Sequence, residues 1–359
     1  MQFTTTSQDL LRTLNFLPVI KNNLDPVMNT YMVTINDRVE FRASDGQYFS
    51  KALVENITSV KPSEEPFFIP MRNFYEIIRT LPQTEIKVSF NKAQVTVKTE
   101  KSKFIVRLFQ YDRKAQGYPT NADKLVFSIN TKLLYQYLTQ TMIASGVSIG
   151  CDSDATKFEV GEQLNVISSD GKKLACVINT NKIKDSFLVP NKTLGYLYLV
   201  LKGKDEDLSI AISDDRVRFT LGAFESVSPI DRSSRYPDHN KFLTLQPDKH
   251  LKMKRNLLKD SVQRANIISE GDVEYPITLN IKSDTLQMVS SKPSIGEIEE
   301  LLECEYKGEP ITVAFDTDNL LPFISKVEVE DIELHFINPE APMIYKQGNF
   351  TYLALPVRI

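Results

Sequence analysis

The sequence has few of the residues that build disulfide frameworks and metal sites. Its three cysteines, Cys151, Cys176 and Cys304, are scattered and odd in number, so they offer neither a disulfide framework nor a CxxC metal pair. This pattern indicates a reducing compartment, and we expect a cytoplasmic protein. The first residues show no charged segment followed by an apolar one, and no apolar run approaches the roughly 20 residues that span a bilayer. We therefore expect neither a secretory signal nor contact with a membrane.

Motifs of common enzyme classes are also missing. No GxGxxG, GxxxxGK[ST], HExxH or GxSxG occurs. The three histidines, His239, His250 and His335, are far apart in sequence and follow no ligand spacing, so we interpret each as a surface or core residue. The sequence thus predicts no catalytic residues, no cofactor and no metal.

One acidic segment, GEIEELLECE at residues 296–305, needs a separate interpretation. Alternating acids on a strand can bind a metal, but no Asp/Asn-Gly calcium loop accompanies them. A solvated or charge-pairing face is the better interpretation. An enzyme that uses paired acids such as Glu299 and Glu303, for instance on carbohydrate, is a distant alternative because no spacing supports it.

The bulk composition describes an ordinary globular protein. A chain of 359 residues suggests two or three domains, and 42% hydrophobic with 25% charged residues is typical of soluble folds. The formal net charge is −3. Any binding to nucleic acid must therefore rely on local basic patches rather than on the whole surface.

A hairpin signal occurs twice, 125 positions apart. The stretch FRASDGQYFSKALV covers residues 41–54 and VISSDGKKLACVI covers residues 166–178, with Ser44-Asp45-Gly46 and Ser169-Asp170-Gly171 at their centres. In both, an apolar or alternating run enters the Ser-Asp-Gly and another leaves it. Asp-Gly tolerates the positive φ that a tight turn between strands demands, so each copy predicts a β-hairpin.

Strand-to-helix patterns repeat as well. FTTTSQDLLRTLNFL begins at Phe3 and FSINTKLLYQYLTQTM at Phe127, with Ser7 and Asn130 as expected N-caps, and a weaker copy begins at Leu243. A second such element begins at residues 67, 187 and 311, with a proline at positions 70 and 190. Alternating segments lie between them, with turns expected at 91–92 and 214–215.

These repeats predict an α+β chain made of three similar units of roughly 120 residues, each with two helices and antiparallel sheets. The predicted domains are residues 1–123, 124–243 and 244–359. Three unrelated α+β domains with a chance likeness are the alternative.

Basic residues accompany the predicted helices. In KRNLLKDSVQRANII, Leu258, Val262 and Ala265 form an apolar stripe, while Arg255 and Lys259 share the neighbouring polar face. Further basic residues in or beside helices are Arg72, Arg79, Lys192, Lys202, Lys204 and Lys252. On one helix such a face is simply solvated; on several helices that share a wall, the faces add up to a stripe that binds DNA phosphates without sequence preference.

Three motifs in this order resemble the bacterial DNA polymerase sliding clamp, the β subunit of the replicative polymerase: SSDGKKLACV, RYPDHNKFL and the terminal LALPVRI. The resemblance extends along essentially the whole chain. It implies three similar domains per chain and two chains in a six-domain ring, with helices lining a channel for duplex DNA. A repeat-domain scaffold that binds peptides without encircling DNA is the alternative.

The implied function is that of a processivity factor without chemistry of its own. Its implied partners are duplex DNA, the polymerase catalytic subunit, the clamp loader, repair polymerases and a second copy of the chain. The resemblance also implies a pocket for short peptides of these partners. Its residues here are Gly171, Lys172, Lys173, Leu174, Pro237, Lys241, Phe242, Leu353, Leu355, Pro356, Val357, Arg358 and Ile359.

The resemblance further implies a subunit interface and a set of residues that face DNA. The interface residues are Lys101, Lys103, Phe104, Val106, Ile267, Ile268, Glu297, Glu299 and Glu300. The DNA-facing residues are the basic ones named above, together with Lys21. The chain departs from the family at Asn22, where an arginine is usual, and at Lys172-Lys173, where the family has His-Arg; Phe242 replaces a smaller aliphatic residue. Lys21 is adjacent to Asn22 and is the candidate substitute for that arginine.

Overall fold

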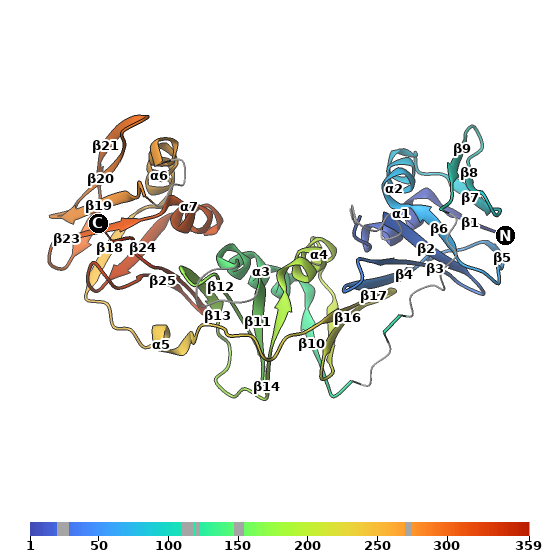
Figure 1. The fold of residues 1–359 in the computed structure, drawn as a ribbon, viewed down its shortest axis with the longest axis horizontal. Coiled ribbons are helices and arrows are strands. Elements are labelled where there is room, and N and C mark those ends of the chain that lie inside the picture. The colour runs from blue at the N-terminus through green and yellow to red at the C-terminus, as the bar shows by residue number, and fades with distance from the viewer. Residues whose placement is uncertain (20–28, 110–117, 120–122, 147–153, 270–273, 359) are drawn as a thin grey trace. The chain divides into compact units, whose positions relative to one another are not determined.

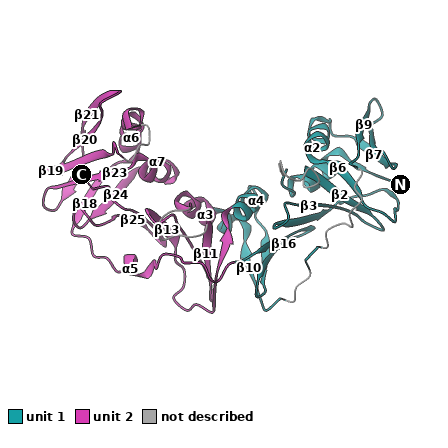
Figure 2. Ribbon diagram, viewed as in Figure 1, with its two compact units in different colours: residues 1–135, 192–230 teal, residues 136–191, 231–359 magenta. Residues whose placement is uncertain are grey.

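The computed structural model describes residues 1–19, 29–109, 118–119, 123–146, 154–269 and 274–358. The chain divides into two compact units (Figure 2). Unit 1 comprises residues 1–135 and 192–230, and unit 2 comprises residues 136–191 and 231–359. Within the described ranges, no helix combines the length and apolar character needed to cross a membrane.

The elements fall into three consecutive groups (Figure 1). The first contains β1 (Gln2–Thr6), α1 (Ser7–Asn15), β2 (Thr30–Ile35), β3 (Val39–Ser44), β4 (Phe49–Leu53), β5 (Ser59–Lys61), β6 (Phe67–Pro70), α2 (Met71–Thr80), β7 (Glu85–Phe90), β8 (Gln94–Lys98) and β9 (Lys103–Arg107). The second contains β10 (Leu125–Asn130), α3 (Thr131–Thr141), the 3₁₀ turn η2 (Met142–Ala144), β11 (Ala155–Val160), β12 (Leu164–Ser169), β13 (Lys173–Val177), β14 (Asp185–Pro190), α4 (Asn191–Leu201), β15 (Asp207–Ile212), β16 (Arg216–Leu221) and β17 (Phe224–Pro229).

A one-turn helix, α5 (Asn240–Leu243), lies in the connection to the third group. That group contains β18 (Lys249–Lys254), α6 (Arg255–Ser269), β19 (Ile277–Lys282), β20 (Thr285–Lys292), β21 (Gly296–Glu303), β22 (Glu305–Lys307), β23 (Ile311–Phe315), α7 (Thr317–Lys326), β24 (Asp331–Phe336), β25 (Met343–Gln347) and β26 (Phe350–Ala354).

Strand pairing repeats along with element order. The first strand of each group pairs antiparallel with the strand that follows its second long helix: β1 with β7, β10 with β15, and β18 with β24. The second strand pairs with the strand before that helix: β2 with β6, β11 with β14, and β19 with β23. The three groups therefore share one topology, and the α+β class expected from the sequence is confirmed. The domain boundaries at 123/124 and 243/244 stay a prediction.

Two sheets combine strands of different groups. In unit 1, an eight-stranded sheet runs β10-β15-β16-β17-β4-β3-β2-β6 beside a five-stranded one, β5-β1-β7-β8-β9. In unit 2, a nine-stranded sheet runs β14-β11-β12-β13-β26-β25-β24-β18-β22 beside a four-stranded one, β21-β20-β19-β23. The first and second groups are thus joined by the pair β4–β17, and the second and third by β13–β26.

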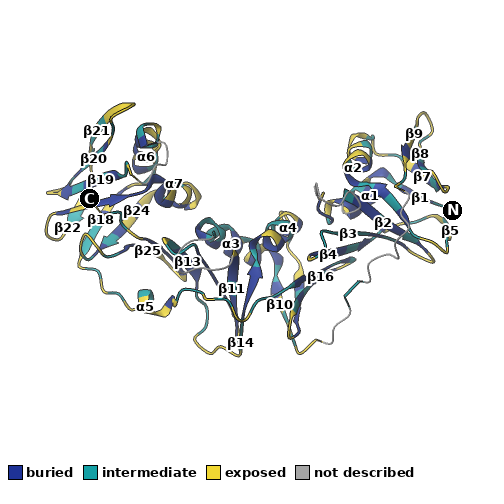
Figure 3. Cartoon of the chain, in the orientation of Figure 1, coloured by how far each residue is buried: buried dark blue, intermediate teal, exposed yellow. Residues whose placement is uncertain are grey.

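The helices pack their apolar stripes on the sheets. In the first group, Leu10 and Leu14 of α1 lie four residues apart, as do Phe74 and Ile78 of α2, and all are at most 1% exposed. They join buried strand residues in one continuous core. Figure 3 shows the same arrangement in each unit, with buried faces on the sheets and exposed outer faces on the helices.

Most local sequence signals are found where they were expected. Asn130 caps α3, since its side-chain oxygen accepts a hydrogen bond from the Lys132 amide at 2.9 Å. Residues 91–93 form the turn between β7 and β8, and residues 213–215 the turn between β15 and β16. The expected cap Ser7 was wrong: Thr6 is the N-cap and accepts from the Asp9 amide, while the Ser7 hydroxyl bonds to the Pro82 carbonyl.

Candidate functional site

The second Ser-Asp-Gly turn is held by its own side chains. Asp170 Oδ1 accepts hydrogen bonds from the amides of Lys172 and Lys173, both at 2.9 Å. Ser169 Oγ accepts from the Gly171 amide at 3.1 Å. Gly171 has φ 86°, a conformation that a residue with a Cβ adopts at a cost, which explains the glycine. The hydroxyl of Tyr236 accepts from the Ser169 amide at 2.9 Å and so fixes the connection to the turn.

A small cavity of about 40 Å³ opens beside this turn. The structure brings eight of the thirteen expected pocket residues around it: Gly171, Lys172, Lys173, Leu174, Pro237, Phe242, Leu353 and Leu355. Ser169 and Pro342 also line it and were missed by sequence reasoning. Ser169 belongs to the quoted Ser-Asp-Gly motif, whereas no sequence signal pointed to Pro342.

The cavity rests on an apolar cluster. Leu174 and Leu353, which face each other across β13 and β26, pack with buried Ile167, Cys176 and Ile344. Phe242 of α5 packs against this cluster while it lines the cavity. Because the floor is apolar and small, it suits one or two aliphatic or aromatic side chains of a ligand rather than a cofactor.

Basic side chains border the cavity. Lys172 is exposed, and Lys173 Nζ lies 3.5 Å from Asp170 Oδ2 and donates to the backbone oxygen of Asp318 at 3.2 Å. Burial raises the pKa of nearby Asp316, the cap of α7, and the two lysines partly counteract this. A basic rim over an apolar floor favours an acidic or carboxylate-bearing peptide with hydrophobic anchors.

The remaining expected pocket residues lie outside the cavity lining. Lys241 is on α5, and the Val357 amide donates to the Ala314 carbonyl at 2.8 Å. Leu355, which does line the cavity, donates its amide to the Lys172 carbonyl at 2.8 Å. Pro356 is half-buried and Arg358 is exposed. Ile359 lies outside the described residues. These backbone bonds attach Leu355 to the turn and Val357 to β23.

His239 lies behind α5, at its N-cap position. Its side chain is 3% exposed, and its Nε2 is 3.7 Å from Glu159 Oε2. Burial lowers the pKa of His239, although Glu159 opposes the shift. His239 is thus a buried side chain, one of the two settings, surface or core, that the sequence analysis expects for it.

The strands expected at the subunit interface are sheet edges among the described residues. β9 ends the five-stranded sheet and β21 ends the four-stranded one. On β9, Lys103, Ile105 and Arg107 are exposed, whereas Val106 is 9% exposed and Phe104 packs against the core. The exposed apolar residue of this strand is thus Ile105, which sequence reasoning missed.

The edge strand β21 presents an acidic face. Glu297, Glu299, Leu301 and Glu303 are exposed, with Leu301 at 68%. Glu300 points to the opposite face, where its carboxylate accepts hydrogen bonds from Arg264 at 2.5 and 2.7 Å and from Ser261 at 2.6 Å. These bonds lower the pKa of Glu300, with Arg264 as the largest cause.

The other expected interface residues differ in exposure. Ile267 on α6 is 68% exposed and Ile268 is half-buried. Lys101 is exposed in the turn before β9. Glu300, engaged within its own unit, is less free to pair with a partner than Glu297 and Glu299.

The basic residues of unit 1 have different local partners. On α2, Arg72 is exposed and Arg79 forms an ion pair with Glu76 at 2.6 Å. On α4, Lys192 forms an ion pair with Asp45 at 2.5 Å. Lys21, and Asn22 beside it, lie outside the described residues.

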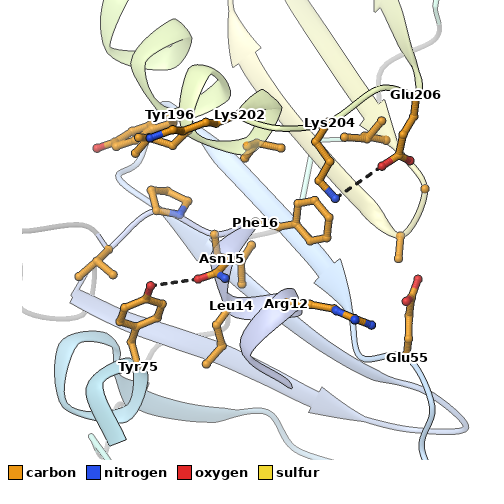
Figure 4. Close-up of a pocket in the computed structure, with 18 residues that line it drawn as sticks. Arg12, Leu14, Asn15, Phe16, Glu55, Tyr75, Tyr196, Lys202, Lys204 and Glu206 are labelled. Carbon is orange, nitrogen blue, oxygen red and sulfur yellow. Dashed lines mark hydrogen bonds and ion pairs between the residues drawn. The ribbon is translucent and has the colours of Figure 1, made fainter. Parts of the chain in front are cut away.

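Lys202 and Lys204 line a larger cavity of about 930 Å³ within unit 1 (Figure 4). Lys204 Nζ lies 4.7 Å from the centre of the Phe16 ring and 3.5 Å from Glu206. Arg12 of α1 faces the same cavity. Glu55 and Glu206 line the cavity as well, so its charge is mixed, and Arg12, Lys202 and Lys204 are its candidates for phosphate contact.

In unit 2, the three expected basic residues lie in three settings. Lys259 is on α6 and half-buried. Arg255 donates to the carbonyls of Val329 and Ile324, so it holds the end of α7 and the segment after it. Lys252 lies on the face of β18 opposite to buried Leu251, which points it away from the helix side.

Comparisons with known proteins agree along the chain. The family model of the DNA polymerase III beta subunit N-terminal domain matches residues 1–119, and that of its C-terminal domain matches residues 242–358. The beta sliding clamp of Escherichia coli K12 is 24% identical over 375 residues, and that of Haemophilus influenzae 23% over 376, each covering 100% of both chains.

Solved structures have the same fold. The DNA polymerase III beta subunit of Thermotoga maritima superposes with a TM-score of 0.90 at 19% identity, covering 100% of this chain and 99% of that one. The sliding clamp of Pseudomonas aeruginosa bound to griselimycin superposes with a TM-score of 0.88 at 21% identity, with both chains fully covered.

Proposed function

This chain belongs to the DNA polymerase III beta subunit family, the bacterial sliding clamps, and we propose that it serves as the processivity factor of a replicative polymerase. Two copies close head to tail around duplex DNA, and the ring tethers the polymerase without chemistry of its own. Escape then requires opening of the ring, so each contact with DNA can be weak. Tethering raises the effective concentration of the polymerase at the primer end.

The observation that carries this proposal is the pairing of the strand that follows the hairpin in each group. β4 pairs with β17, the last strand of the second group, and β13 pairs with β26, the last strand of the third. The equivalent strand of the third group is β21, and the last strand of the first group is β9; both are edges. Pairing of β21 with β9 of a second copy repeats the junction a third time, and two such contacts close a ring.

The exposed faces of these two edges are complementary. β9 presents Lys103 and Arg107 around Ile105, and β21 presents Glu297 and Glu299 beside Leu301. Apolar centres with opposite charges around them favour a heterologous contact and disfavour pairing of like edges. We assign the subunit interface to these residues together with Lys101, Ile267 and half-buried Ile268. Phe104 and Val106 pack into the core of their own unit and support β9 from its inner face.

The basic residues on the helix side provide the contact with DNA. We assign contacts with DNA phosphates to Arg72, Lys202, Lys204 and Lys259, and also to Arg12. Contacts of this kind are independent of sequence and weaken steeply with salt, as a sliding ring requires. Lys252 points away from the helix side, and Arg255 donates to backbone carbonyls, so we expect both to contribute less to DNA binding.

The cavity beside the Ser169–Gly171 turn takes the peptides of the partners. The polymerase catalytic subunit is the first of these; the clamp loader and repair polymerases compete for the same pocket. The protein acts in the cytoplasm, where these partners work on the chromosome.

The first experiment measures the solution mass by light scattering behind a sizing column. We expect a mass near twice 40.9 kDa. Ile105→Asp and Leu301→Asp should each shift the mass to that of a monomer, because they place a charge at the apolar centre of the contact. Lys87→Asp is the matched control, since Lys87 is exposed on the same face of the same sheet but on an interior strand. A wild-type monomer at micromolar concentration would overturn the ring.

A second experiment tests encirclement itself. Protein loaded on nicked circular DNA should stay bound in high salt and be lost once the circle is linearised. Equal loss from both forms would mean that the protein binds DNA without enclosing it.

A further inference from the structure

The neighbouring strands β18 and β24 (Figure 1) pair antiparallel, and their pairing places polar residue pairs in a row on one face. Lys254 lies opposite Asp331, Lys252 opposite Glu333, and His250 opposite His335. The first rung is an ion pair, with Lys254 Nζ 2.9 Å from Asp331 Oδ1. The last rung instead places two imidazoles face to edge, with ring centres 5.0 Å apart.

The two histidines and Glu333 converge on one point. The Nδ1 atoms of His250 and His335 are 2.8 Å apart, and Glu333 Oε1 is 3.9 Å from each. All three ligand atoms lie within 4.8 Å of one another. The arrangement follows from strand geometry: cross-strand partners share a face, and Glu333 lies two residues before His335 on that same face.

We propose that His250, Glu333 and His335 form a binding site for a divalent transition-metal cation, with Zn²⁺ as the representative ion. Two imidazoles and a carboxylate are a ligand set that such ions prefer, and three protein ligands leave a position for water. Sequence reasoning did not find this site because 83 residues separate His250 from Glu333, and only strand pairing brings them together.

The geometry needs only small adjustments to accept the ion. A tetrahedral Zn²⁺ about 2.0–2.1 Å from each ligand holds its ligand atoms roughly 3.3 Å apart. The two nitrogens must therefore separate by about half an ångström and the carboxylate must approach by a similar amount. His250 and Glu333 are partly exposed, at 38% and 54%, so their side chains have room to move.

Burial lowers the pKa of His335, although Glu333 acts in the opposite direction. A neutral imidazole is the form that binds a metal. The hydrogen bond between the rings uses one Nδ1 proton; on metal binding that proton moves to Nε2, so both Nδ1 lone pairs face the ion. Lys252 lies opposite Glu333, and the charge of Lys346 acts on His335; both cations limit the affinity of the site.

A bound ion would cross-link two neighbouring strands of the nine-stranded sheet. It would therefore stabilise the folded chain by an amount that grows with the logarithm of the ion concentration above the dissociation constant, because the unfolded chain does not hold the three ligands together. The site is independent of the pocket and of ring closure, so its failure would leave the proposed function untouched.

The test is calorimetric titration of the untagged full-length chain with ZnCl₂ alone. We expect one ion per chain, with a dissociation constant that rises at least about 10-fold in His335→Gln and Glu333→Gln, the lower limit for losing groups that support a metal ligand set. Asp331→Asn is the matched control, because Asp331 is a carboxylate on the same face of the same strand. All variants carry Cys304→Ser, which removes a thiol of intermediate exposure.

Two readouts separate a built site from scattered surface binding. Co²⁺ in place of Zn²⁺ should give visible absorption that is lost in His335→Gln and kept in Asp331→Asn. The midpoint of thermal unfolding should rise with Zn²⁺ in the control and not in the histidine variant. Equal Zn²⁺ affinity in all variants, or no binding in the Asp331→Asn control, would overturn the proposal.

Discussion

The two Ser-Asp-Gly turns share one backbone design. Asp45 Oδ1 accepts from the Tyr48 amide at 2.8 Å, as Asp170 Oδ1 does from the amide of Lys173 at 2.9 Å. Gly46 and Gly171 have φ values of 92° and 86°. In both hairpins the third residue after the glycine pairs with the next group: Phe49 with Val227, and Leu174 with Leu353. The turn recurs because it begins the strand that joins neighbouring groups.

The surroundings of the two turns differ. At the first turn, the second residue of α4, Lys192, forms an ion pair with Asp45, whose side chain is 6% exposed. The ring centre of Tyr196 lies 5.0 Å from that of Tyr48. At the second turn, the equivalent residue of α7 is Asp318, and it accepts a hydrogen bond from Lys173 through its backbone. The second residue of the helix thus changes from Lys192 to Asp318, while the second turn keeps an aspartate and adds Lys173.

This difference explains how one repeated junction acquires a function at a single place. At the first turn, Lys192 and Tyr196 of α4 contact Asp45 and Tyr48 of the hairpin. At the second, the connection supplies Pro237 and Phe242, which stand beside the hairpin and line a cavity. Backbone pairing forms the junction in both places, and a few side chains determine whether a partner can also bind there.

The largest expected effect is a loss of peptide binding at the second turn. Leu355→Asp places a carboxylate in the apolar cavity, and we expect polymerase-peptide affinity to fall by about 30-fold, the cost of losing one central anchor. Arg358→Ala should weaken the same binding less, because Arg358 is exposed. Fluorescence anisotropy with a labelled peptide measures both.

The matched control for that experiment is Gln47→Asp, which adds the same charge to the exposed tip of the first turn. It should leave peptide affinity and the dimeric mass unchanged. If Gln47→Asp weakened the peptide as much as Leu355→Asp did, the two turns would not differ in function.

The second prediction concerns what the turns share. Gly46→Ala and Gly171→Ala each force a Cβ into the left-handed region, and each should lower the free energy of unfolding by roughly 1–2 kcal/mol. Urea denaturation measures both losses. Only Gly171→Ala should also weaken peptide binding. Unequal losses of stability would show that the turns are not equivalent as folding elements.

Periodicity and turn chemistry predicted much of this fold. The hairpins, Pro70 and Pro190 before their helices, and the cap Asn130 are local signals, and each lies where the sequence indicated. Local signals also placed β9 and β21 as strands. They failed at Ser7 because Thr6 and Ser7 are neighbours and both residue types cap helices. The Ser7 hydroxyl instead donates to the Pro82 carbonyl, 75 positions along the chain, and this tertiary contact has no local signal.

The site could be predicted only in part. Eight pocket residues were identified through resemblance, whereas Pro342 comes from a connection with no motif of its own. On β9 the interface was assigned to Phe104 and Val106, yet alternation on a strand exposes Ile105 between them. Which face of a strand is buried depends on packing against α2 and the rest of the core, and this choice is not encoded in a short segment.

The third prediction concerns the ion pair at the first turn. Lys192→Met removes the cation beside the buried Asp45 carboxylate, and we expect a loss of roughly 1 kcal/mol in the free energy of unfolding. Asp45→Asn and the double variant complete a thermodynamic cycle, whose coupling energy isolates the pair. Peptide affinity should be unchanged in all three variants. A coupling energy near zero would mean that Tyr196 packing alone closes this turn.

The smallest expected effect is a response to acid that distinguishes the two units. All three histidines belong to unit 2, and burial holds the pKa of His239 below its ordinary value of about 6.5. Just below that pH, the unfolded chain binds a proton that the folded chain does not bind. The free energy of unfolding therefore falls as the pH is lowered through this window, and it levels off below the folded pKa.

Hydrogen exchange between pH 7.5 and 5.5, corrected for intrinsic rates, should show loss of protection around α5 before β4. His239→Gln should reduce that loss, since it removes the proton that the unfolded chain gains; an unchanged response would assign the acid sensitivity to other groups.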